Sequence, residues 1–172
     1  MKTPAGARSA LIATLVVSTV LAPFRPVSAC TRILWNDNKL AAFVGRTMDW
    51  PESTEPVLTV LPRGMQRDGG RLGKQAVVAD NPARWTSRYA SIVTTIYGVG
   101  TADGVNEKGL AAHMLFLVAT DFGPRDPALQ GVQAGLWAQY LLDNAATVAE
   151  ALELMQLVGI PAAEQRLDDY PH

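Results

Sequence analysis

The chain has 172 residues, of which 48% are hydrophobic and 18% charged, with 15 basic and 16 acidic residues and a formal net charge of −1. This length fits one domain beside a targeting segment, and the near-neutral charge excludes the basic footprint of a nucleic-acid-binding protein. The sequence contains one cysteine, Cys30, which excludes an internal disulfide framework.

The first 29 residues have the pattern of a secretory signal peptide. Lys2 and Arg8 precede an uncharged, mostly apolar run over residues 9–21, which is too short to span a bilayer comfortably. Val27-Ser28-Ala29 then provides the small residues of a cleavage site. We therefore expect export to the periplasm or the medium, with no membrane span after cleavage. The mature domain, residues 30–172, would carry 12 basic and 16 acidic residues.

Cleavage after Ala29 would make Cys30 the first residue of the mature protein. Its thiol would then share a residue with a free α-amine that can take the thiol proton, the arrangement of an N-terminal-nucleophile hydrolase. The run Val-Ser-Ala-Cys also resembles a lipobox, and a lipidated Cys30 could not act as a nucleophile. We favour ordinary cleavage because Pro23, Arg25 and Pro26 interrupt the apolar run before the cysteine.

Short apolar runs separated by turn residues predict strands in the first part of the mature chain. Residues 31–35 and 40–44 predict a β-hairpin that brings residues 46–49 back beside Cys30. The remaining expectations, in chain order, are a strand at 57–61, a loop at 63–81, a strand at 91–99, a turn around 105–107 framed by Asp103-Gly104 and Lys108-Gly109, and a strand at 110–118.

Two helices are expected after the strands. Apolar residues at helical spacing between 132 and 141, including Trp137, form one buried face of a helix that Asn144 can end. Thr147 and Glu150 have the spacing of a capping box for the second helix. Strands followed by a helix pair predict an α+β fold with the helices on one face of a mostly antiparallel sheet.

Cys30, Arg46 and Asp49 are the residues that we expect to carry chemistry. A guanidinium near a thiol favours the thiolate, and an aspartate can hold an α-amine through a charge-assisted hydrogen bond. Such an amine can accept a proton near neutral pH, since its reference pKa is about 7.7–8.0. Taken alone, an arginine and an aspartate after a strand are also typical surface charges. His113 is interpreted as a structural strand histidine, because the α-amine already provides a base.

Three separated motifs make the chain resemble the choloylglycine hydrolase family, which includes bile salt hydrolases and penicillin V acylases. They are Cys-Thr-Arg at residues 30–32, Gly-Arg-Thr-Met-Asp-Trp at 45–50 and Ala-Asp-Gly-Val-Asn-Glu-Lys-Gly-Leu at 102–110. The cysteine after a signal peptide is similar to the Gram-negative penicillin-acylase branch. The resemblance implies the αββα N-terminal-nucleophile fold and hydrolysis of a linear, non-peptide amide, as in penicillin V, an N-acyl homoserine lactone or a conjugated bile acid. It implies no cofactor and no metal.

The resemblance also assigns roles to particular residues. It makes Cys30 the nucleophile, places Arg46 beside the thiolate and lets Asp49 hold the α-amine. It assigns a backbone N–H of the oxyanion hole to Phe116, whose side chain would line the substrate pocket together with Met48. An aromatic residue at 116 favours penicillin-acylase substrates over bile salts. The implied partner is a small acyl-amide substrate, and a homo-oligomer stays open.

The family's domain extends well beyond the length of this chain, so residues 30–172 correspond to its N-terminal part. We therefore expect an incomplete αββα sandwich that exposes a sheet edge and an apolar sheet face. Three hypotheses stay open: an exported cysteine amidase, a non-catalytic lipoprotein lipidated on Cys30, and an inactive truncated paralogue.

Overall fold

The computed structural model describes residues 30–117 and 120–159. The expected signal peptide lies outside these ranges. The strands are β1 (Arg32–Trp35), β2 (Phe43–Arg46), β3 (Val57–Leu61), β4 (Gln66–Asp68), β5 (Arg71–Leu72), β6 (Gln75–Ala76), β7 (Arg84–Thr86), β8 (Ser91–Ile96), β9 (Gly100–Asn106), β10 (Ala111–His113), β11 (Gln130–Gly131) and β12 (Val158–Gly159). The helices are the 3₁₀-helix η1 (Ala134–Leu136), α2 (Trp137–Asn144) and α3 (Val148–Met155). None of these helices is long and apolar enough to cross a membrane.

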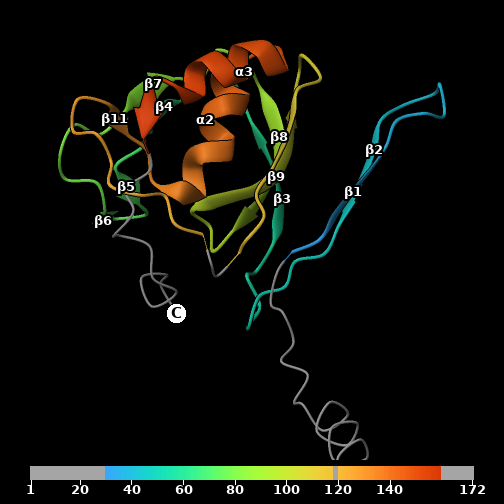
Figure 1. Cartoon of the computed structure of the whole chain (residues 1–172), viewed down its shortest axis with the longest axis horizontal. Helices are drawn as coiled ribbons and strands as arrows, with labels where there is room; N and C mark the ends of the chain where they lie inside the picture. The colour runs from blue at the N-terminus through green and yellow to red at the C-terminus, as the bar shows by residue number, and fades with distance from the viewer. Residues whose placement is uncertain (1–29, 118–119, 160–172) are drawn as a thin grey trace, which may run out of the picture.

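A four-stranded antiparallel sheet in the order β10-β9-β8-β3 forms the centre of the fold. The helices α2 and α3 lie on one face of this sheet, with α2 packed against β9 and β10 (Figure 1). Val93 from β8 and Leu142 from α2 are fully buried between the two layers. The predicted α+β arrangement, with helices on one face of an antiparallel sheet, is confirmed.

Gly104 in β9 allows α2 to approach the sheet closely. A Cβ at this position would lie 2.5 Å from Val93 Cγ1 and 2.9 Å from Leu142 Cδ1. The interpretation of Asp103-Gly104 as part of a turn was wrong, because both residues lie inside β9 and the turn follows at residues 107–109. A glycine inside a strand often marks such a close approach of another element.

The other strand predictions are confirmed to different degrees. The strand at 57–61 is β3, and the strand at 91–99 is β8, which ends at Ile96. The strand expected over residues 110–118 is β10 within the described residues 110–117. The expected loop at 63–81 was wrong in part, since it contains β4, β5 and β6, which pair in short two-stranded sheets. Strands of two or three residues are too short to show a period-two pattern.

Capping interactions fix the ends of the two helices. Thr147 Oγ1 accepts a hydrogen bond of 3.2 Å from the Glu150 N–H, as the capping-box prediction requires, and the Glu150 carboxylate accepts one of 2.9 Å from the N–H just before Thr147. Asn106 at the end of β9 donates to the carbonyl oxygens of Leu142, at 2.9 Å, and Ala145, at 2.7 Å. These bonds satisfy otherwise orphaned groups at the end of α2 and tie that helix to the sheet.

The sheet face turned away from the helices is apolar and exposed. Val60 faces Ile92 across β3 and β8, and Ile92 faces Val105 across β8 and β9. Leu58 and Val60 are 70% and 71% exposed. The expected exposed apolar sheet face is therefore present in the described part of the chain.

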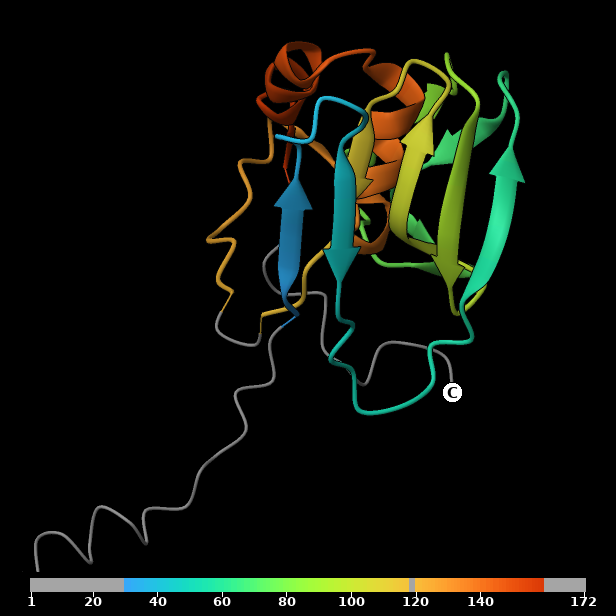
Figure 2. The same cartoon turned by 90° about the vertical axis from the view of Figure 1, so that its right-hand side faces the viewer.

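The hairpin of β1 and β2 forms a separate two-stranded sheet, paired from Arg32 opposite Arg46 to Trp35 opposite Phe43. Figure 2 shows that its strands run along roughly the same direction as those of the central sheet. Both Trp35 and Phe43 are more than half exposed. The predicted hairpin is confirmed, and its second strand begins later than the sequence indicated.

Replacing Gly104 with alanine should lower the free energy of unfolding of the full chain by about 1–3 kcal/mol, because the added methyl group overpacks a filled core. Urea denaturation followed by tryptophan fluorescence measures this loss. Gly45→Ala in β2 is the matched control, since its new Cβ would meet only the side chain of Ile33, at 3.2 Å, which is 67% exposed and can move aside. Equal losses in the two variants would contradict the close approach at Gly104.

Candidate active site

Cys30 lies against the segment that follows β10. The Phe116 N–H donates a hydrogen bond to Cys30 Sγ, with a nitrogen–sulfur distance of 3.4 Å, and the Cys30 N–H donates to the Phe116 carbonyl oxygen at 3.3 Å. The thiol is free and half-buried. A fixed backbone donor beside the sulfur also lies close to where the oxygen of an attacked carbonyl would develop negative charge.

The chain after β2 returns to Cys30, as the hairpin prediction requires. The Thr31 N–H donates to Thr47 Oγ1 and the Thr47 N–H donates to the Thr31 carbonyl oxygen, both at 3.0 Å. This pairing places Arg46 and Met48 beside the thiol, and both side chains line the same pocket as Cys30.

The pocket at Cys30 has a volume of about 290 Å³ and is mostly apolar. Its lining includes four of the residues predicted from the sequence, Cys30, Arg46, Met48 and Phe116, together with Trp50, Ile96, Ala102, Met114, Leu115, Leu117, Thr120, Phe122 and Ala134. A concave apolar site with one thiol and one guanidinium suits a small ligand with an apolar body and a single polar reacting group.

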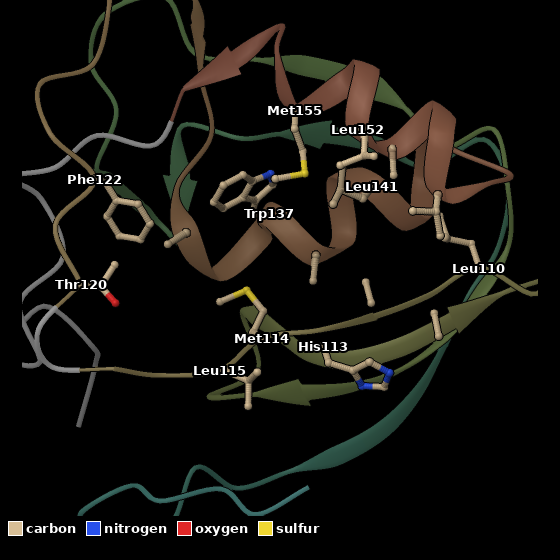
Figure 3. Close-up of a pocket in the computed structure, with 16 residues that line it drawn as sticks. Leu110, His113, Met114, Leu115, Thr120, Phe122, Trp137, Leu141, Leu152 and Met155 are labelled. Carbon is tan, nitrogen blue, oxygen red and sulfur yellow. The ribbon is translucent and has the colours of Figure 1, made fainter. Parts of the chain in front are cut away.

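A second cavity of about 420 Å³ lies between β10 and the two helices (Figure 3). It shares five lining residues with the pocket at Cys30: Met114, Leu115, Thr120, Phe122 and Ala134. Trp137, which the sequence analysis interpreted as a core residue, lines this cavity and contacts Phe122 edge to face, with ring centroids 6.4 Å apart. The apolar lining therefore continues from the thiol to the helices.

Asp49 is the predicted site residue that the structure does not place against Cys30. It is half-buried after β2 but lines neither cavity, and within the described ranges its carboxylate has no hydrogen-bond partner. Because Ala29 precedes Cys30 in this chain, the Cys30 nitrogen is a peptide nitrogen rather than the free amine that Asp49 is expected to hold. The role of Asp49 stays a prediction.

Two hydrogen bonds hold the Arg46 guanidinium. Nη1 pairs with Asp103 Oδ2 at 2.8 Å, and Nε donates to the Thr47 carbonyl oxygen at 3.2 Å. Nη2 is buried and has no partner among the described residues. A buried donor without a partner is costly, so this nitrogen is suited to a thiolate or a carbonyl oxygen that forms or enters beside it.

Sequence reasoning placed three residues of this site outside the active site, and it interpreted one of them, His113, as a structural strand histidine. Trp50 packs edge to face on Phe116, with ring centroids 4.8 Å apart, and His113 Nδ1 lies 2.9 Å from Asp103 Oδ1. Trp50 and Asp103 belong to the motifs that carry the resemblance, so their motif membership was the available indication. His113 had no such indication, because its contact with Asp103 depends on the register of two strands.

Comparison with known proteins supports a common ancestry. The sequence profile of the linear amide C–N hydrolases, choloylglycine hydrolase family, matches residues 30–169. Over 137 residues the chain is 37% identical to a penicillin V acylase from Pectobacterium atrosepticum, an alignment that covers 74% of this chain and 35% of that protein.

Solved structures show the same relationship. The penicillin V acylase from Agrobacterium tumefaciens superposes with a TM-score of 0.64 at 37% identity, covering 75% of this chain and 39% of that one. A mutant of the conjugated bile acid hydrolase from Clostridium perfringens shares the fold, with a TM-score of 0.59 at 22% identity over 77% of this chain and 39% of that one.

The chain thus spans little more than a third of the length of these relatives. The expected N-terminal-nucleophile hydrolase fold is confirmed for the part that is present. Since the profile matches continuously from Cys30 to residue 169, the chain belongs to the choloylglycine hydrolase family of linear amide C–N hydrolases.

Proposed function

We propose that this protein is an exported amidohydrolase in which Cys30, freed by removal of residues 1–29, attacks the linear amide bond of an acylated amine. The observation that carries the proposal is the position of the Phe116 N–H, 3.4 Å from Cys30 Sγ, in a mostly apolar pocket. Family membership supports a linear amide as the bond that is cleaved.

In the proposed reaction the α-amine of Cys30 takes the thiol proton, and the thiolate attacks the amide carbonyl carbon. The resulting oxyanion accepts a hydrogen bond from the Phe116 N–H, and one such preorganised donor lowers the barrier by about 3–4 kcal/mol. The C–N bond then breaks, the leaving nitrogen takes the proton from the α-ammonium, and a thioester remains on Cys30. Water hydrolyses the thioester and releases the acid.

Arg46 and Asp49 complete the proposed set. Arg46 lines the pocket with a buried Nη2 that no described residue binds, so its charge can stabilise the thiolate. Asp49 is proposed to hold the α-amine after maturation, through a charge-assisted hydrogen bond. Its carboxylate is free for that partner within the described part of the chain.

The proposed acyl group is small and apolar or aromatic, such as the phenoxyacetyl group of penicillin V. Support comes from the apolar pocket of about 290 Å³ and from the aromatic pair Trp50 and Phe116 at its wall. A longer N-acyl chain would extend past Ala134 into the adjoining cavity of about 420 Å³. An aromatic side chain at 116 makes a bile acid the less favoured substrate.

The proposal requires that the exported protein begin with an unmodified Cys30. Intact-mass spectrometry of protein recovered from the exported fraction, after expression with residues 1–29 in a bacterial host, should give the mass of a chain that starts at this residue. A mass increased by acyl chains would support the lipoprotein hypothesis instead, and a start at another residue would remove the α-amine from the mechanism.

Replacing Cys30 with alanine should lower the rate of amide hydrolysis by a factor on the order of 10³ or more, because the nucleophile is lost, and serine should also lower it, because a hydroxyl is a weaker nucleophile than a thiolate. The assay follows the primary amine released from penicillin V. Asp37→Ala in the loop between β1 and β2 is the control, since this residue lies outside both cavities. Equal activity of the Cys30 variants and the unchanged chain would contradict the proposed nucleophile, whereas an inactive but folded unchanged chain would support the truncated paralogue.

Met48→Ala should shift the acyl preference toward larger groups. This side chain lines the pocket and is 39% exposed, so its removal widens the site at small cost to the core. We expect kcat/KM for a short acyl group to fall by about tenfold, since an apolar contact is worth roughly 1–3 kcal/mol, while a bulkier acyl group loses less. Met65→Ala, which lies outside both cavities, should leave the ratio unchanged.

A further inference from the structure

Three side chains next to the pocket at Cys30 form a connected polar cluster. Arg46 comes from β2, Asp103 from β9 and His113 from β10, and their side chains are 13%, 22% and 14% exposed. The proposed reaction uses the arginine alone. The aspartate and the histidine therefore need an explanation of their own.

The carboxylate of Asp103 divides its two oxygens between the other members of the cluster. Oδ2 accepts from Arg46 Nη1 at 2.8 Å, and Oδ1 lies 2.9 Å from His113 Nδ1. Because a carboxylate accepts but does not donate, His113 Nδ1 carries the proton in this bond. The register of the sheet places Asp103 directly opposite His113, so the backbone brings these two side chains within reach of each other.

The side chains of the cluster point to the sheet face away from the helices, although His113 also borders the cavity of about 420 Å³. Figure 3 shows the His113 ring pointing away from Trp137 and Leu141, which lie above the cavity. Gly104, the neighbour of Asp103, faces Leu142 of α2, and since side chains alternate along a strand, Asp103 points to the opposite face. Arg46 reaches this face from the base of the hairpin that carries Cys30.

We propose that Asp103 and His113 are positioning residues for Arg46. Asp103 holds Nη1, which leaves Nη2 as the guanidinium nitrogen without a protein partner among the described residues. His113 fixes the rotamer of the Asp103 carboxylate from the other side. A long arginine side chain has many rotamers, and such supporting hydrogen bonds keep its charge in one place beside the pocket.

This inference rests on the proposed function only in taking Arg46 to act on Cys30. It can be tested without any amide hydrolysis, because Cys30 is the only cysteine in the sequence and alkylation reports on its thiol alone. The probes are iodoacetate, which is anionic, and iodoacetamide, which is neutral and of similar size. The ratio of their alkylation rates at pH 7 measures the positive charge at the thiol separately from its accessibility.

Arg46→Leu should lower the iodoacetate-to-iodoacetamide rate ratio by about threefold to tenfold, and it sets the reference for full loss of the guanidinium. Asp103→Asn and His113→Leu should lower the ratio in the same direction. Asp103→Asn is the more informative of these two variants, because removing a negative charge near the thiol would by itself raise the ratio. A fall in Asp103→Asn therefore reports displacement of the Arg46 charge.

Two further variants separate positioning from a general structural role. His113→Asn keeps a donor close to the position of Nδ1 and should restore the ratio to within about twofold of the unchanged chain. His113→Leu combined with Arg46→Leu should have no effect beyond that of Arg46→Leu alone, since a residue that acts through the arginine has nothing left to position. Thermal unfolding of each variant shows whether its fold is kept.

The proposal is overturned if Asp103→Asn raises the ratio or leaves it unchanged, or if His113→Leu still lowers the ratio when Arg46 is absent. A His113→Asn variant that is folded yet behaves like His113→Leu would also overturn it. Loss of amide hydrolysis with the expected pattern of ratios would count against the proposed function and leave the positioning role intact.

Discussion

The structure depends on one contact between two distant parts of the chain: Cys30 at the foot of the hairpin and Phe116 after β10. The backbone of Phe116 bonds both to the nitrogen and to the sulfur of Cys30, at 3.3 and 3.4 Å. Without this contact the thiol would have no fixed donor beside it, and the pocket would lose one wall. A nucleophile and an oxyanion donor are useful to catalysis only when they are held together in advance.

The hairpin depends on polar contacts at its base because most of its apolar side chains are exposed in the described part of the chain, although Trp35 and Phe43 stack on each other. Leu34 and Trp35 of β1 are 52% and 57% exposed. The Arg46–Asp103 ion pair joins the hairpin to the central sheet at 2.8 Å. Arg46, which is proposed to act on the thiol, therefore also attaches the hairpin to the central sheet. A substitution of Arg46 can change both the charge at the thiol and the accessibility of the thiol, so the two have to be measured separately.

Features that depend on neighbouring residues in the sequence could be predicted, whereas contacts that depend on the pairing of strands could not. The cap at Thr147 follows from neighbouring residues, and the helix that it begins, α3, is present. The role expected of the thiol at Cys30 stays a prediction. Strand β9 was not predicted because the Asp-Gly pair at residues 103–104 is typical of a turn. In the structure Gly104 lies inside the strand and leaves room for the side chain of Leu142. The partnership of His113 with Asp103 depends on the register of β9 and β10, which no local pattern in the sequence states. Phe116 came from the resemblance of separated motifs, because its proposed contribution is a backbone N–H, which the chemistry of a side chain does not indicate.

The central claim is that the sulfur of Cys30 carries the acyl group during the reaction. The most direct measurement is mass spectrometry of the exported protein, quenched with acid during turnover of an N-acylated substrate and then digested. Acid keeps the neighbouring α-amine protonated, so an acyl group on the sulfur cannot move to the nitrogen before analysis. We expect the acyl mass on the peptide that begins at Cys30 when the digestion is done with pepsin in acid, and no such mass on the Cys30→Ala variant. Turnover without an adduct there, or with the acyl group on another residue, would contradict the account.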